Sequence, residues 1–152
     1  MLNKINFTLS NIHTPVLGYA AKLEKSMDLF FATLPVGKIV KRVNWSITTN
    51  TDIFALGGNR IYESEDTKED KIDLEKTVLR RERQTLHRLP KSRALVFAFK
   101  SYMYPIKDVK EEGSGEELAQ AIDGLKEGSV PGMHFYKRGV VWGEAVKRYL
   151  RS

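Results

Sequence analysis

In three segments of the chain, apolar residues recur at the spacing that places them on one face of a helix. In residues 20–34, leucine, methionine and phenylalanine recur every three or four positions, which predicts an amphipathic helix. The same repeat appears in residues 116–125 and 140–150, where Trp142 falls on the apolar side of the second segment. We therefore expect three amphipathic helices, the last one close to the carboxyl end of the sequence.

Other segments carry the residues typical of β-strands. Residues 38–48 alternate valine, tryptophan and isoleucine with polar residues, and residues 94–103 are almost continuously apolar, which predicts a buried strand. Residues 5–12 mix apolar and polar side chains and fit either a strand or an irregular lead-in. The proline and glycine in residues 13–18 predict a loop.

One segment leaves two structures open. Residues 74–86 are rich in leucine, glutamate, lysine and arginine, which suits a helix, yet no helical stripe is present. If they are extended, they pair with residues 94–103 through a hairpin at residues 89–92. Residues 51–71 are polar and acidic and predict a surface loop. Strands between helices indicate one α+β domain over residues 1–152.

Composition and charge narrow the functional classes. Hydrophobic residues make up 41% and charged residues 29%, no stretch reaches the ~20 apolar residues of a membrane span, and residues 1–6 lack a signal-peptide core. We expect an intracellular, cytoplasmic protein without a membrane partner. The net charge is +6, and the 25 lysine and arginine residues are interleaved with 19 acidic residues. This favours acidic partners or anionic cofactors and argues against nucleic acid.

The chain has no cysteine. This excludes disulfides, iron–sulfur clusters, thiolate-ligated haem and a cysteine nucleophile within the sequence. Phosphate-cradling glycine loops, nucleophile elbows and paired zinc histidines are also missing. Histidine is then the expected ligand of any bound iron, and the sequence offers His13, His87 and His134.

A dense charged cluster lies in the ambiguous segment. In a strand, Arg81 and Arg83 would point to one face and Arg80, Glu82 and Gln84 to the other. That second face would combine a cation, a carboxylate and an amide, and arginine binds anions through a planar fork. A solvated face with internal ion pairs explains the same pattern without any site.

The cluster belongs to a run that resembles a family motif. Residues 79–90 read LRRERQTLHRLP, which is similar to the RxERQTLxRLP motif of the haem-dependent oxidative N-demethylase family. Residues 12–16 (IHTPV) and 42–47 (RVNWSI) resemble two more stretches of that family, in the same order. Residues 107–149 resemble its fungal members. The likeness covers nearly the whole chain and matches the carboxyl-terminal part of the family's haem domain.

The resemblance implies a PAS-like antiparallel sheet flanked by helices, incomplete at its amino end, with residues 77–86 as a strand. It implies oxidative removal of a methyl group from a small amine, using dioxygen and haem b. Electrons would come from a separate reductase carrying FMN and a [2Fe–2S] cluster, since the chain has no cysteine. A degenerate, non-catalytic PAS-like module that binds haem or a partner is the alternative, and a cofactor-free basic binding protein is a third. Whether the chain is an active enzyme, or a homo-oligomer, is left open.

The resemblance also suggests residues that contact haem. His13 lies in the family-like segment and is the candidate axial ligand of the iron, which would leave the opposite iron face free for dioxygen. Arg80 and Arg83 are candidates for the haem propionates. Trp45 would pack against the porphyrin, or alternatively fill the protein core.

Two further side chains are candidates for the chemistry. Glu82 would balance a protonated amine or pass protons to bound oxygen, and Gln84 would orient either group. His87 is a weaker ligand candidate, because the matching family position is often another residue. His134 is expected to be structural or peripheral.

Overall fold

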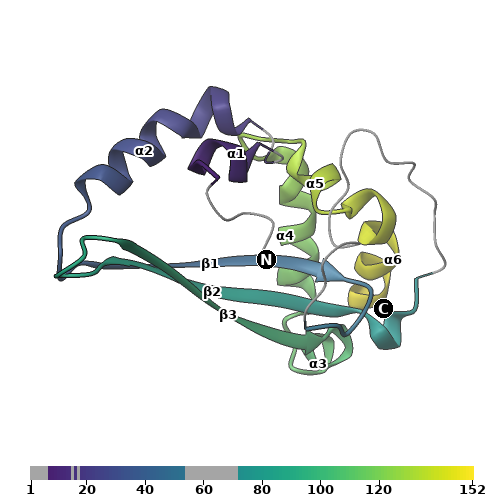
Figure 1. Cartoon of the computed structure of the whole chain (residues 1–152). Helices are drawn as coiled ribbons and strands as arrows, with labels where there is room; N and C mark the ends of the chain where they lie inside the picture. Colours follow the sequence, from purple (N-terminus) through teal and green to yellow (C-terminus); the bar gives the residue numbers. More distant parts are fainter. Residues whose placement is uncertain (1–6, 15, 17, 54–71) are drawn as a thin grey trace. The chain divides into compact units, whose positions relative to one another are not determined.

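The computed structural model of the chain describes residues 7–14, 16, 18–53 and 72–152. Figure 1 shows helices and a long sheet, and the described part contains six α-helices, one π-helical segment and one 3₁₀ turn. In chain order the elements are α1 (Leu9–His13), η2 (Tyr19–Leu23), α2 (Glu24–Thr33), β1 (Ile39–Thr48), η3 (Leu74–Lys76), β2 (Val78–Arg88), β3 (Leu95–Pro105), α3 (Ile106–Glu111), α4 (Gly115–Glu127), α5 (Met133–Tyr136) and α6 (Gly139–Arg151).

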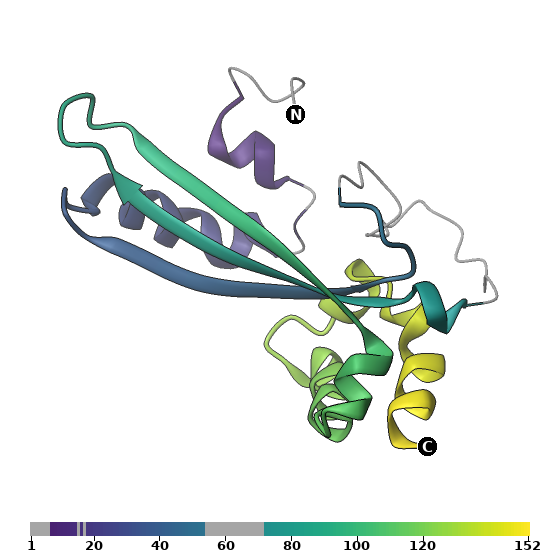
Figure 2. The same cartoon turned by 90° about the horizontal axis from the view of Figure 1, so that it is seen from below.

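The three strands form one antiparallel sheet in the order β1-β2-β3, with β2 in the middle (Figure 2). The Leu89 amide donates to the Ala94 carbonyl at the hairpin, and the Ile106 amide donates to Thr77 at the other end. Both bonds correspond to the same register, so the β2–β3 ladder runs without a net slip. The predicted α+β class, antiparallel sheet and hairpin are confirmed.

Strand β2 settles the segment whose structure was open. Arg81 and Arg83 are exposed, whereas Glu82 is half-buried and Gln84 is buried. This alternation is the two-residue period of a strand with one covered face. The helix-favouring composition is therefore overridden by pairing with both neighbouring strands, as tertiary contacts often override propensity.

Strand β3 is present as predicted, but the expectation that it is buried is wrong. Phe97 is 54% exposed and Phe99 is 49% exposed. Side chains project to the two faces of a sheet, and the described residues do not cover the face of β3 that carries Phe97 and Phe99 well enough to bury them. A continuous apolar run predicts a strand covered on both faces only when layers of helices or another sheet lie on each side.

The amino-terminal expectations are also corrected. Residues 9–13 form α1, not a strand, an irregular lead-in or a loop, and the Thr8 side chain caps this helix by accepting from the Asn11 amide. His13 is the last residue of α1. Pro15 and Leu17, and residues 54–71 with the acidic run, lie outside the described residues.

The chain divides into two compact units, and its description as one domain stays a prediction. The first comprises Met1–Val40 and Thr85–Phe97, and the second Lys41–Gln84 and Ala98–Ser152. Within the first unit, the helix predicted over residues 20–34 is confirmed by α2. The first turn of the predicted helix is the π-helical segment η2. Leu34 is buried after the end of α2, whereas Phe30 stays 38% exposed.

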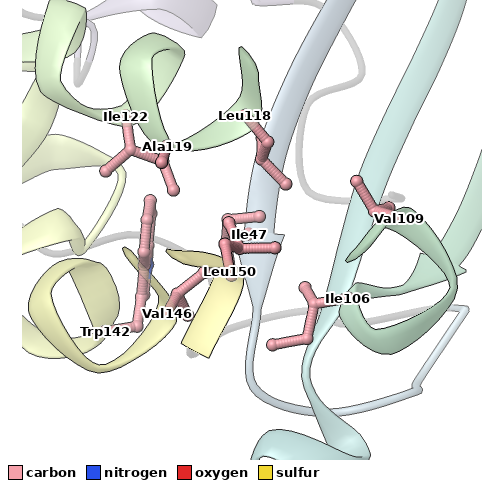
Figure 3. Close-up of a cluster of buried hydrophobic side chains, with 9 residues drawn as sticks. All are labelled: Ile47, Ile106, Val109, Leu118, Ala119, Ile122, Trp142, Val146 and Leu150. Atoms are coloured by element: carbon pink, nitrogen blue, oxygen red, sulfur yellow. The ribbon is translucent and has the colours of Figure 1, made fainter. Parts of the chain in front are cut away.

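The second unit contains the main hydrophobic core. Figure 3 shows Ile47 of β1 lying among side chains from α3, α4 and α6. Helices α4 and α6 were both predicted, and Trp142 is 1% exposed in the core, as its periodicity required. Helices α3 and α5 have six and four residues, too short to produce a periodic pattern. No helix of the described residues is long and apolar enough to cross a membrane.

Candidate functional site

Three side chains on one face of β2 form a polar row with a fourth from β1. The Arg42 Nε donates to Gln84 Oε1 at 2.5 Å, and Gln84 Nε2 donates to Glu82 Oε2 at 3.1 Å. The Nε of Arg80 lies 3.9 Å from Glu82 Oε1. Arg42 thus fixes which way the Gln84 amide points, and the amide in turn holds one oxygen of the Glu82 carboxylate.

Arg80 also anchors the backbone that follows β1. Its Nη1 donates to the Asp52 carbonyl at 3.0 Å, and its Nη2 donates to the Ile53 carbonyl at 2.8 Å. A longer contact of 3.4 Å joins Nη2 to the Ser101 hydroxyl on β3. The guanidinium is therefore already bound by protein oxygens on several sides. An anion bound here would share Arg80 with these carbonyls.

Arg83 lies on the other face of β2. It is exposed, as is Arg81, and both alternate with the polar row. The structure therefore brings Arg80, Glu82 and Gln84 together and leaves Arg83 apart from them. A role of Arg83 in binding a propionate stays a prediction.

Trp45 packs against the core of the second unit, as the core alternative predicted. Lys137 Nζ donates to the Trp45 carbonyl at 2.6 Å and lies 4.9 Å from the centre of its ring. A cation over an indole face is favourable. Contact of Trp45 with a porphyrin stays a prediction.

His13 has the hydrogen bonding of a positioned imidazole. Its Nδ1 lies 2.8 Å from the Leu9 carbonyl. Because a carbonyl can only accept, Nδ1 carries the proton, and in the neutral ring Nε2 keeps a free lone pair. The ring also stacks on Tyr19, with centroids 4.8 Å apart and planes at 14°. A ligand histidine is commonly oriented by such a bond from its other nitrogen.

Tyr19, which stacks on His13, was not singled out from the sequence. It is buried, and its hydroxyl has no hydrogen-bond partner among the described residues. Burial, and then the negative charges of Asp28 and Glu24, raise the pKa of the phenol. Gly18 precedes it with φ +71°, a conformation that favours glycine and lets the chain turn between α1 and η2.

The remaining histidines lie elsewhere. His134 is buried in α5 against Gly139 of α6, where a β-carbon would come 2.5 Å from the imidazole. Burial and the nearby cations Lys126 and Lys147 lower the pKa of this imidazole. This is the structural setting expected for His134. His87 is a half-buried residue of β2 in the first unit.

In the part of the chain that is described, no three potential metal-binding side chains of histidine, aspartate or glutamate come together. A haem iron requires fewer, because the porphyrin supplies the equatorial ligands and one imidazole is enough on the protein side. The geometry of His13 fits that requirement. Arg80 provides the type of cation that a propionate pairs with.

The model of a known family matches residues 1–147. Its description reads haem-dependent oxidative N-demethylase, alpha subunit-like. The chain belongs to this family. The resemblance seen in the three sequence motifs is thereby confirmed. The name of the family indicates dependence on haem. Among curated proteins, none matches the chain.

Two residues that were not predicted to belong to the site lie in or next to the family-like stretches. Arg42 is the first residue of the second stretch, and it donates a hydrogen bond to Gln84, which is 42 positions further along the chain. Tyr19 follows the first family-like stretch and stacks on its histidine. For both residues, the sequence signal that could have identified them was their position in or close to a family-like motif.

Proposed function

We propose that this protein binds haem b through Nε2 of His13 and removes a methyl group oxidatively from a small methylated amine. Dioxygen is the oxidant, and a separate reductase with FMN and a [2Fe–2S] cluster supplies the electrons. We also infer that the chain is of the fungal type, on the likeness of residues 107–149. The family match over residues 1–147 is the observation that supports the reaction class.

The bond between His13 and the Leu9 carbonyl supports the choice of ligand. It holds the ring in one orientation and fixes the tautomer of the neutral ring, in which Nε2 carries the lone pair that can bind iron. Stacking on Tyr19 limits rotation of the same ring. Haem, when bound, supplies the redox chemistry that activates dioxygen.

Glu82 supports the amine as substrate. Its side chain is 22% exposed, so its charge is neither fully screened by water nor fully buried. Gln84 occupies Oε2, while Oε1 lies 3.9 Å from Arg80, beyond an ordinary hydrogen bond. Oε1 therefore retains lone pairs that can accept from an ammonium group or hold a proton.

Arg80, Arg83 and Trp45 complete the proposed contacts of haem. Arg80 and Arg83 would pair with propionates, and Trp45 would cover part of the ring. Arg80 has the strongest support of the three, because its guanidinium is half-buried and oriented by the Asp52 and Ile53 carbonyls.

A non-catalytic PAS-like module is the second candidate. The observation that favours it is the same set of carbonyl bonds to Arg80, because a guanidinium satisfied by the protein has fewer donors left for a propionate. In this alternative the polar row stabilises the sheet. Haem or a partner protein is bound without turnover.

Haem titration tests the proposal directly. Hemin is added to the purified protein, and the absorption spectrum is recorded for the natural sequence, His13→Ala and His87→Ala. We expect a saturable Soret band that His13→Ala loses and His87→Ala keeps, with unchanged circular dichroism in both variants. Absence of saturable uptake by the natural sequence would exclude haem binding.

Turnover separates the two candidates. The haem-loaded protein is supplied with dimethylamine, NADPH and an FMN- and [2Fe–2S]-containing reductase, and formaldehyde is measured. Formaldehyde release that requires all components supports the demethylase. A loaded protein that gives none with any small methylated amine supports the non-catalytic module.

A further inference from the structure

The strands carry many more cations than carboxylates, whereas cations of the helices form ion pairs with carboxylates. Glu82 is the single carboxylate among the residues of β1, β2 and β3, against seven cations. In the helices, by contrast, Lys147 contacts both Asp123 and Glu144, and Arg151 contacts Glu116. The seven cations of the strands are Lys41, Arg42, Arg80, Arg81, Arg83, Arg88 and Lys100.

Strand alternation places four of these cations on the face opposite Glu82. Arg42 shares a face with Gln84, and Ser101 shares it with Arg80, so the residues that alternate with them point the other way. On this second face Trp45, Ile47 and Leu79 pack against the hydrophobic core. We give the name basic face to seven other residues of the same face, all of which belong to the second unit. They are Lys41, Val43, Arg81, Arg83, Lys100, Tyr102 and Tyr104.

The register of the β2–β3 ladder brings these cations close together. It places Lys100 opposite Arg83 and Tyr102 opposite Arg81. Like charges directly opposite each other in a sheet are destabilising. No ion pair joins Lys41, Arg81, Arg83 or Lys100 to a described carboxylate. An arrangement that lowers the stability of the sheet is typical of a functional surface.

The aromatic residues of the basic face point to a protein partner. The rings of Tyr102 and Tyr104 stack with centroids 6.5 Å apart, and Lys100 lies 5.2 Å from the centre of the Tyr102 ring. Tyr102 thus has neighbours on both sides along its strand, which leaves it poorly placed to stack on a nucleic-acid base. Val43 is 51% exposed and Tyr104 is 41% exposed. Exposed tyrosine and arginine are enriched at protein interfaces.

We propose that the basic face docks the acidic surface of a partner protein, and that this partner is the electron donor. The identity of the partner as a donor rests on the proposed function, which requires electrons from outside the chain. Complementary charge accelerates association and sets the orientation in which the two proteins meet. The contact would depend strongly on salt, because its cations are exposed.

Binding of an acidic [2Fe–2S] ferredoxin and of poly-L-glutamate tests this proposal, with and without loaded haem. The test variant is Lys41→Glu/Arg81→Glu, and its milder form is Lys41→Gln/Arg81→Gln. The matched control is Lys107→Glu/Arg148→Glu, which makes the same change of net charge at exposed cations of α3 and α6. Circular dichroism verifies that each variant is folded, and an oligothymidylate probe is measured in parallel.

We expect salt-sensitive binding of both acidic probes, weakened at least about tenfold by the test variant and hardly by the control. The glutamine variant should show a smaller loss in the same direction. Equal losses in test and control variants, no binding of either acidic probe, or tighter binding of oligothymidylate would overturn the proposal. Failure of haem uptake leaves these binding results readable, so the two proposals fail separately.

Discussion

The Nε of Arg88 donates to the Leu34 carbonyl at 2.8 Å, joining the end of β2 to the chain just after α2. The same guanidinium donates to the Phe31 and Ala32 carbonyls and, at 2.6 Å, to the Arg93 carbonyl in the hairpin. Carbonyls at the end of a helix lack partners within the helix and carry its negative dipole. One arginine therefore completes α2 and fixes the hairpin of the first unit.

Replacement of Arg88 by methionine should destabilise the first unit. Methionine keeps the apolar stem but leaves these carbonyls without a charged donor, which we expect to cost about 1–3 kcal/mol. Urea unfolding measures the loss, and amide exchange at residues 30–34 locates it. Lys91→Met, at an exposed position of the same hairpin, is the control. A free energy of unfolding within about 0.5 kcal/mol of the control would contradict this role.

Tyr19→Phe should leave stability unchanged or raise it by about 1 kcal/mol. The substitution removes a buried hydroxyl without a described partner and keeps the ring that stacks on His13. Tyr19→Ala, in contrast, should cost about 3–5 kcal/mol because it leaves a cavity. Denaturant unfolding of the three proteins tests the pair. A large loss in Tyr19→Phe would mean that the hydroxyl is bound.

Glu82→Gln should lower the rate of formaldehyde release by about 10²–10⁴-fold, the usual contribution of a positioned acid or base. The amide is similar in shape but cannot carry the charge that holds an ammonium group. Haem uptake, followed by the Soret band, should stay normal. Glu117→Gln, an exposed carboxylate of α4, is the matched control. Activity within about twofold of the control would remove Glu82 from the reaction.

His134 should make the second unit less stable in mild acid. Burial lowers its pKa below the ordinary 6.5, and the facing cations Lys126 and Lys147 lower it more than Glu144 and Asp123 raise it. As the pH falls, His134 therefore binds a proton in the unfolded chain before it does so in the folded protein. The free energy of unfolding then decreases as the pH drops below about 6.5. Melting temperatures measured from about pH 7.5 to pH 5.5 should fall in the natural sequence and fall less in His134→Gln. Parallel curves for the two proteins would show that another group titrates.

The sequence predicted the long elements well because their patterns extend over several turns or residues. Helices α4 and α6 were predicted with Trp142 on the inner face, and it is nearly inaccessible to solvent. Helix α1 was missed because five residues are too few to define a period. The exposure of Phe97 and Phe99 could not be predicted, because a local pattern does not reveal which faces of a strand other parts of the fold cover.

The candidate site was predictable only in part. Alternation in β2 correctly separated Arg81 and Arg83 from Glu82, since the two faces of a strand follow from position alone. The bond between Arg42 and Gln84 joins two strands separated by a long stretch of chain, so no local pattern contains it. The stack of Tyr19 on His13 depends on the turn at Gly18, whose left-handed backbone is set by the fold.

The unbroken register between β2 and β3 restricts how the hairpin can vary in length. Inserting one residue into β3 just after the turn, at Leu95, would shift every later residue of β3 by one position. Lys100 and Tyr102 would then turn toward the side of Glu82, while Ser101 would leave Arg80. Length changes of two residues would preserve the two faces, so even-numbered insertions are the ones that this hairpin can accept.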